Sequence, residues 1–197
     1  MHSDPLTLDH FEETCATIAW DVEHVQVGRG TAAIGHDIVH LGDVVVRRLS
    51  LSHALLHEFR IEEGWTTLVL VSATRGPGVW NGRHSPLHGI GLLLPGRDHV
   101  ATTPAGWSVI EVDVRIETVL EEVLASKTYE WASRHENPVL QLEPSVAAEA
   151  AVLLERRAFG REAPHRSAVL EILRWAIGRS SALDPPPGRA QTDVLAR

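Results

Sequence analysis

Histidine is the residue type that most clearly raises the question of chemistry in this sequence, because the chain contains twelve of them. Three pairs are separated by four positions: His36 and His40, His53 and His57, and His84 and His88. This spacing places both side chains of a pair on one face of either a helix or a strand. Imidazoles that share a face can bind a metal ion or hydrogen-bond to a polar ligand.

The stretch HALLHEFRI gives the most informative orientation to one of these pairs. Read as a strand, it places on one face His53, Leu55, His57, Phe59 and Ile61. The two histidines then point inward. Three roles are open for them there: metal ligands, groups that recognise a polar ligand, or hydrogen-bonded core residues. A metal site usually needs a third protein ligand, and the sequence offers none at a recognisable spacing. We therefore predict no metal site.

Other catalytic arrangements are missing from the sequence. It contains no Gly-x-Ser-x-Gly nucleophile elbow and no phosphate-binding glycine loop. Glu111 and Asp113 alternate with apolar residues, so we expect them on the solvated side of a strand rather than in acid–base catalysis. We predict no catalytic residue, no cofactor and a protein that is not an enzyme.

Tryptophan is the second informative residue type, with six in the chain. A buried indole supplies a large apolar area and an N–H group that needs a partner, in a core or in the wall of a ligand pocket. We expect Trp65 and Trp80 near the rim of such a pocket. Together with the inward-facing residues, the predicted ligand-binding set is His53, His57, Phe59, Trp65 and Trp80.

Residues 15–115 must supply the scaffold for these side chains. Short apolar runs alternate there with Gly, Pro, Asp and Asn, which is typical of many short strands in a sandwich or barrel. The clearest runs are DVVVRRLSL, TTLVLVSA, IGLLL and WSVIEVDV. Asn81-Gly82 is a strong hairpin signal. We predict an antiparallel β-barrel that binds a ligand.

After Arg115 the apolar period changes from two to about 3.6 residues, which indicates amphipathic helices over residues 116–180. The first begins at about residue 116, and two more are expected at about 144–159 and 165–177. Their apolar stripes need a partner surface, which is either the barrel or a second subunit.

The last predicted helix carries a stripe that we expect to form a dimer contact: Val169, Leu170 and Leu173. Residues 181–197 follow as a proline-rich linker and tail, because three consecutive prolines exclude a helix. Such a linker leading to a short tail suggests that the chain was cut from, or descends from, a longer protein.

Composition limits the partners of this chain. A net charge of −8 and a pI near 5.8 disfavour a DNA-binding surface, which requires clustered Lys and Arg. The single cysteine, Cys15, excludes a disulfide framework and fits a reducing compartment. No apolar run is long enough to span a bilayer. We predict a cytoplasmic protein without a membrane partner.

Two segments of the sequence resemble the N-terminal effector-binding domain of AraC-type transcriptional regulators. They are WDVEHVQVGRG at residues 20–30 and a later segment, residues 78–114, with GIGLLLPG followed by PAGW. The resemblance implies a cupin-like barrel that binds a small-molecule effector, followed by helices through which such regulators dimerise. We thus predict an α+β fold, in which a cupin-like antiparallel β-barrel is followed by amphipathic C-terminal helices.

The function implied by this resemblance is small-molecule sensing and dimerisation in a bacterial AraC-type regulator. Members of the family contact DNA through helix-turn-helix motifs, which this chain lacks, so we expect no DNA binding by this chain itself. Two alternatives stay open: a metal-dependent cupin-like enzyme, and a stand-alone interaction protein that forms heterodimers with a full-length regulator.

Overall fold

Two antiparallel β-sheets form the body of the chain in the computed structural model, which describes residues 20–27 and 29–182. The smaller sheet contains, in spatial order, β1 (Trp20–Val27), β4 (Ala54–Ile61), β9 (Asp98–Thr103), β6 (Val79–Trp80) and β7 (Arg83–His84). The larger contains, in spatial order, β12 (Ser181–Ala182), β11 (Val139–Gln141), β8 (Gly89–Leu93), β5 (Trp65–Ala73), β10 (Trp107–Arg115), β3 (Val44–Leu51) and β2 (Ile34–His40).

The strands form where the sequence predicts them. All four clear apolar runs become strands of the larger sheet, namely β3, β5, β8 and β10. Asn81 and Gly82 both have positive φ, 46° and 74°, as a two-residue hairpin turn between β6 and β7 requires. The α+β class is confirmed.

The predicted closed barrel is not found. Within residues 20–27 and 29–182, no strand pairing joins the two sheets, which face each other as separate layers. The chain passes between the two layers several times, for example between β3 and β4 and again between β4 and β5. Apolar alternation fixes which face of a strand is buried, but it does not fix whether the edge strands meet.

The helices follow β10 along the chain. Two of the predicted helices are confirmed at α4 (Pro144–Phe159) and α5 (Arg166–Ile177). The helix expected from residue 116 is short, because α2 (Ile116–Thr118) passes directly into a π-helical turn, η1 (Val119–Val123). A further helix, α3 (Ser126–Ser133), was not predicted, because its sequence SKTYEWAS has no apolar stripe.

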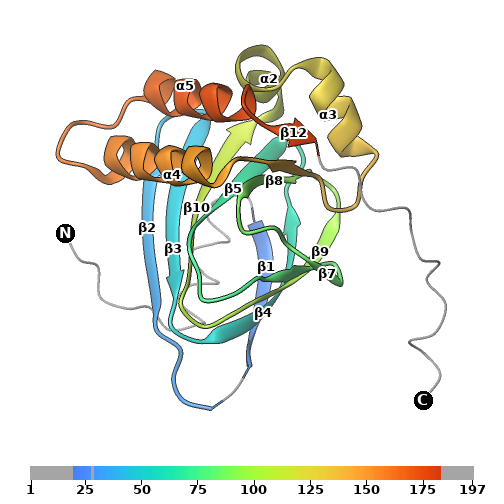
Figure 1. Cartoon of the computed structure of the whole chain (residues 1–197), viewed down its shortest axis with the longest axis vertical. Coiled ribbons are helices and arrows are strands. Elements are labelled where there is room, and N and C mark those ends of the chain that lie inside the picture. Colours follow the sequence, from blue (N-terminus) through green and yellow to red (C-terminus); the bar gives the residue numbers. More distant parts are fainter. Residues whose placement is uncertain (1–19, 28, 183–197) are drawn as a thin grey trace.

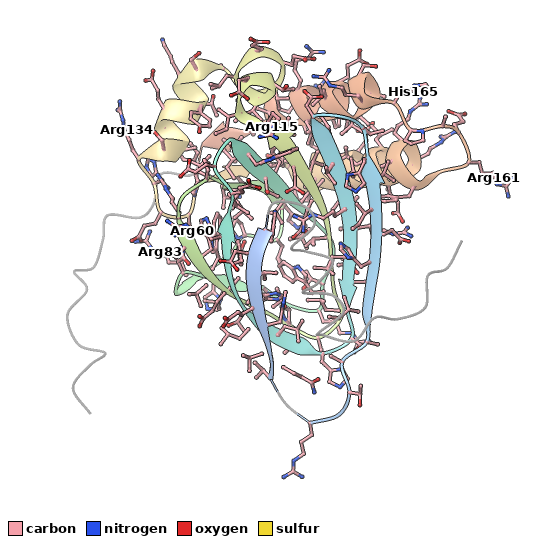
Figure 2. All side chains as sticks on the ribbon, turned by 180° about the vertical axis from the view of Figure 1, so that it is seen from behind. Arg60, Arg83, Arg115, Arg134, Arg161 and His165 are labelled. Atoms are coloured by element: carbon pink, nitrogen blue, oxygen red, sulfur yellow. The ribbon has the colours of Figure 1, made fainter. Side chains whose placement is uncertain are left out.

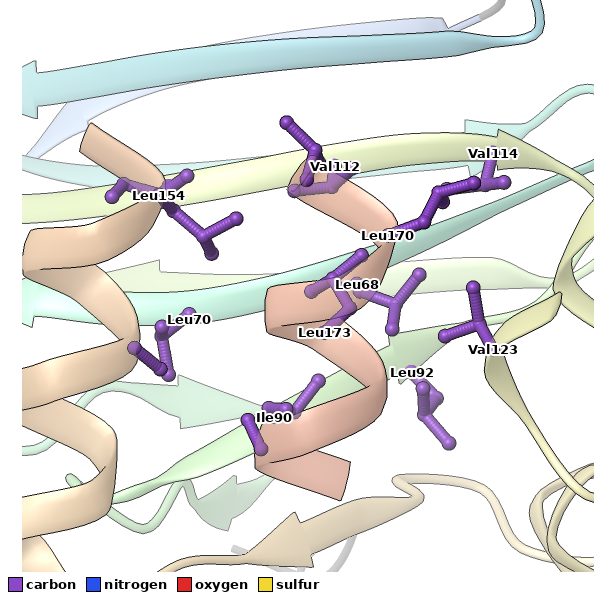
Figure 3. Close-up of a cluster of buried hydrophobic side chains, with 14 of the residues drawn as sticks. Leu68, Leu70, Ile90, Leu92, Val112, Val114, Val123, Leu154, Leu170 and Leu173 are labelled. Atoms are coloured by element: carbon purple, nitrogen blue, oxygen red, sulfur yellow. The ribbon is translucent and has the colours of Figure 1, made fainter. Parts of the chain in front are cut away.

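The helices α4 and α5 lie together on the larger sheet, on the side away from the smaller sheet (Figure 1). Figure 3 shows the apolar side chains between these layers: Leu154 from α4 and Leu170 from α5 meet Leu68 of β5, Ile90 of β8 and Val112 of β10. This layer is one of two apolar clusters. The other lies between the two sheets.

The three residues expected at a dimer contact belong to this helix–sheet layer. Val169, Leu170 and Leu173 are 0%, 2% and 2% exposed, and they pack against the chain's own sheet. The expectation of a dimer contact at these side chains is therefore corrected. A stripe of helical period shows that a face is buried, but it does not identify the surface that covers the face.

The change from strands to helices lies between β10 and α2, at Arg115 and Ile116. The two parts nevertheless share one sheet, because β11 pairs with β8 after the first helices. The first two residues of the expected linker also form a strand, β12, which pairs with β11. Residues 15–19 and 183–197 lie outside the described residues.

None of the helices in the described ranges has the length and apolar character needed to cross a membrane.

Candidate functional site

A pocket of about 110 Å³ lies between the two sheets. Both sheets contribute to it, and its walls are mostly apolar. The aromatic members of its lining are Trp20, Phe59, Trp80 and Trp107. An apolar cavity of about 150 Å³ in a protein core accepts benzene, so this pocket is on the scale of a ligand with a single ring.

A row of rings lies on the smaller sheet, and three of its members line the pocket: Trp20, Phe59 and Trp80. Trp20 of β1 stacks on Phe59 of β4 with 5.1 Å between ring centroids, and Phe59 stacks on His99 of β9 at the same separation. His99 in turn lies 5.6 Å from the ring of Trp80. The pairing register explains the contact between the middle rings, because Phe59 and His99 are directly opposite each other on adjacent strands.

A buried ionic cluster forms the base of the pocket on the larger sheet. Arg47 of β3 makes two hydrogen bonds to the Asp113 carboxylate, 2.9 Å from Nε to Oδ2 and 3.1 Å from Nη2 to Oδ1. Its Nη1 lies 3.2 Å from Oε2 of Glu111. Arg47 and Glu111 are register partners on neighbouring strands, so their side chains leave the sheet on the same face.

The two carboxylates therefore lie where the sequence did not predict them. Glu111 is 7% exposed and Asp113 is 1% exposed. The alternation on β10 is real, but the helices cover the face with Ile110 and Val112, and the smaller sheet covers the other face. The expectation of a solvated face was wrong, because the sequence does not reveal a second layer of structure.

Both oxygens of the Asp113 carboxylate accept hydrogen bonds. Besides the two bonds from Arg47, its Oδ1 accepts hydrogen bonds from Trp20 Nε1 at 3.1 Å and from Thr67 Oγ1 at 2.5 Å. The guanidinium of Arg47 also lies 3.9 Å from the centroid of the Trp20 ring, in cation–π geometry. These contacts connect β1 to the larger sheet, so Asp113 has a structural position beneath the pocket.

Glu111 differs from Asp113, because it lines the pocket itself. Its ionic partner is Arg47 Nη1, which contacts Oε2. Burial raises the pKa of Glu111, and the nearby Arg47 charge opposes this increase without cancelling it. A carboxyl group of this kind can accept a hydrogen bond from a ligand, or pair with a positive charge on it.

Histidines occupy the other end of the pocket. His57 lies opposite His24 on β1, with the two rings edge to face at 4.8 Å, and both line the pocket. The His57 Nε2 and Thr103 Oγ1 atoms are 2.8 Å apart and hydrogen-bonded. Burial, with the neighbouring His24, lowers the pKa of His57 to about 3, so the ring is neutral near pH 7.

His99 is the histidine that connects the aromatic row. Trp80 Nε1 donates a hydrogen bond to His99 Nδ1 at 3.2 Å. Burial lowers the pKa of His99 to about 4, so its ring is also neutral near pH 7. The sequence did not single out this residue, because it lies at the start of a short strand with no other histidine at a regular spacing.

The structure places three of the five predicted ligand-binding residues, His57, Phe59 and Trp80, in the lining of the pocket. His53 is not among the lining residues: it precedes β4, and its Nδ1 is hydrogen-bonded to Ser52 Oγ at 2.8 Å. Trp65 is also outside the lining. It packs below Arg115, whose guanidinium lies 4.2 Å from the ring centroid.

The ionic part of the site was not predicted from the sequence. The signal available was a pair of strands with charges inside apolar runs, VVVRRL for Arg47 and VIEVDV for Glu111 and Asp113. Opposite charges at inward positions of two strands indicate a buried pair, but their alignment depends on which strands are neighbours.

In the part of the chain that the structure describes, no group of three or more His, Cys, Asp or Glu side chains is arranged to hold a metal ion. The arginines on the surface are dispersed: Arg134 and Arg161 project from opposite sides of the molecule (Figure 2).

Comparison with known proteins gives the fold a counterpart. The sequence matches no family model and no curated protein. Among solved structures, the chain is similar to the AraC-like transcriptional activator CuxR, with a TM-score of 0.61 and 13% sequence identity. The alignment covers 97% of this chain and 73% of CuxR. At this identity, the likeness establishes that this chain and CuxR share a fold.

Proposed function

We propose that this chain is a small-molecule-sensing and dimerisation domain of a bacterial AraC-type transcription regulator, with a cupin-like arrangement of its strands. The observation that carries the proposal is the pocket between the sheets, which combines aromatic walls with buried polar groups. Pockets with this composition are typical ligand sites, because the apolar walls supply affinity and a few polar groups fix orientation. The fold shared with an AraC-like activator supports the regulatory context.

The proposed effector site consists of His57, Phe59 and Trp80 from the sequence prediction, together with Trp107 and Glu111. Binding there would affect β10, which carries both Trp107 and Glu111 and continues directly into α2. A ligand shifts a conformational equilibrium only by its different affinity for the two states. The proposal therefore requires that the ligand-bound and free pockets differ in how β10 meets the helices.

Dimerisation is the second part of the proposal. Because the apolar stripe of α5 is already buried, a contact between two copies must use the outer faces of the helices. On α4 that face includes Val152, which is 63% exposed. DNA contact would belong to a separate helix-turn-helix domain.

The test of sensing is a screen of small molecules by thermal shift, followed by calorimetric titration of each hit. Removing the Phe59 ring in Phe59→Ala, or the imidazole in His57→Ala, should weaken binding by about tenfold or more, which corresponds to roughly 1.4 kcal/mol. Ala101 also lines the pocket, and Ala101→Leu should block it. The matched control is Val100→Leu on the outward face of the same strand, where the residue is 44% exposed. Unchanged affinity in the three pocket variants would reject the site.

The test of dimerisation is the mass in solution, measured by light scattering for the wild-type chain and for Val152→Arg. A dimer that becomes a monomer in this variant is expected. A monomeric wild-type chain would reject this part of the proposal and leave the sensing part in place.

A further inference from the structure

Among the described residues, the base of the pocket holds one guanidinium and two carboxylates. Among the described residues that line the pocket, Arg47 is the one with a permanent positive charge. It contacts two carboxylates, those of Asp113 and Glu111. With Glu111 ionised, the contacts between described residues join one positive charge to two negative charges. His57 adds no positive charge, because its ring is neutral near pH 7.

The carboxylate that faces the pocket is the one with the weaker link to Arg47. Asp113 receives two guanidinium bonds and two further hydrogen bonds, from Trp20 and Thr67. Glu111 has a contact of 3.2 Å at Oε2, while its side chain is 9% exposed. A buried carboxylate is stable only when its charge is paired and its oxygens are hydrogen-bonded. Glu111 therefore has the capacity to pair with a ligand.

An anionic ligand does not suit this arrangement. The guanidinium of Arg47 is already occupied by Asp113 through Nε and Nη2 and approached by Glu111 at Nη1, so an anion would have to displace a carboxylate. It would also approach the Glu111 carboxylate, and repulsion from that group when ionised is strong because the surroundings are apolar.

A positively charged ligand suits both the base and the walls. Its cation would pair with Glu111. Repulsion between this cation and Arg47 would be reduced, because the Asp113 carboxylate neutralises the guanidinium. Trp80 and Trp107 line the pocket, and indole rings attract cations and also pack against apolar groups. A pocket volume of about 110 Å³ limits the enclosed part of the ligand to roughly one ring.

We infer that the pocket selects a small monocyclic organic cation, an amine protonated at neutral pH, whose ammonium group pairs with Glu111 while its ring packs against the aromatic wall. This inference rests on the proposed sensing function and specifies the chemical class of its effector.

The experiment compares three compounds of nearly equal shape and different charge, benzylamine, benzyl alcohol and benzoate, by isothermal titration calorimetry on the whole chain. Benzylamine should bind about tenfold more tightly than benzyl alcohol, the ratio expected for one charge-assisted hydrogen bond, and benzoate should not bind. Glu111→Gln keeps the shape and removes the charge, so the preference for the amine should disappear. The matched control is Glu58→Gln, because Glu58 is exposed on the outward face of β4.

Each outcome decides the inference. Equal or tighter binding of benzyl alcohol to the wild-type chain overturns it and leaves the sensing function intact, because the pocket would still bind a ligand. Binding of none of the three compounds also overturns it, and the wider screen described above then tests the sensing function independently. A preference for the amine that survives in Glu111→Gln shows that another group recognises the cation. The comparison of the three compounds on the wild-type chain holds even if the variant fails to fold.

Discussion

Arg47 and Asp113 form a bidentate ion pair that is almost completely enclosed, with side chains 1% and 2% exposed. The pair joins β3 to β10 directly beneath the pocket, and Trp20 closes it from the opposite sheet. Burying two charges is costly, so the net stabilisation of such a pair is small while both partners are present. Removing the carboxylate alone has a large effect, because the buried guanidinium then loses its bidentate hydrogen bonds.

Asp113→Ala should therefore reduce the free energy of unfolding by about 3–5 kcal/mol, since Arg47 loses its bidentate partner inside the protein and Trp20 and Thr67 lose their acceptor. Urea denaturation followed by tryptophan fluorescence measures this change. The control is Asp98→Ala, because Asp98 is 87% exposed and lies 3.7 Å from Arg60, and a change within about 0.5 kcal/mol is expected there. Equal small effects of both substitutions would show that the buried pair is not essential.

Stability should fall as the pH decreases from about 6.5 towards 4. Burial lowers the pKa of His57 to about 3, and of His36 and His99 to about 4, from a normal value of 6.5. The unfolded chain then binds protons that the folded chain does not, so each histidine removes about 1.4 kcal/mol per pH unit in this window. Their stabilisation is complete above pH 6.5 and is lost as the pH falls.

Glu111 acts in the opposite direction, because its raised pKa favours the protonated form in the folded chain. A series of urea denaturations between pH 7 and pH 4 on the wild-type chain and on His57→Gln separates the contributions. In His57→Gln, the free energy of unfolding should depend less steeply on pH, by about 1.4 kcal/mol per pH unit. Identical slopes would show that His57 does not titrate below its normal range.

Leu173→Ala should destabilise the chain by about 2–5 kcal/mol without changing its mass in solution, because Leu173 is 2% exposed inside the helix–sheet layer. Val152→Ala is the comparison on the exposed face of α4, with a change within about 0.5 kcal/mol. Denaturation and light scattering on both variants give the two readings. If Leu173→Ala converts a dimer to a monomer while stability is unchanged, the residue belongs to an interface after all.

Arg166 connects the start of α5 to two other elements, with bonds of 2.6 and 2.8 Å to Asp43 and 2.7 Å to Glu122. The Arg166 guanidinium holds the pKa of Asp43 well below its usual range. Because these side chains are partly exposed, Arg166→Ala should cost only about 1 kcal/mol, and less at high salt. Denaturation at low and at high salt tests this, and a loss that does not depend on salt would contradict the electrostatic origin.

The sequence by itself determined the local elements. Apolar runs of period two predicted β3, β5, β8 and β10, and runs of period 3.6 predicted α4 and α5, because these periods follow from the geometry of a single strand or helix. It also predicted that residues 55, 57 and 59 share an inward face. His53 precedes the strand, which begins at Ala54, and it is not among the lining residues.

The tertiary structure decided everything that depends on which surfaces meet. Glu111 and Asp113 are buried because β10 is covered on both faces, and their partner Arg47 is more than sixty residues away in sequence. The α5 stripe faces the chain's own sheet rather than a second subunit. Periodicity reports that a face is buried, while the identity of the covering surface depends on contacts between distant segments, which no local pattern encodes.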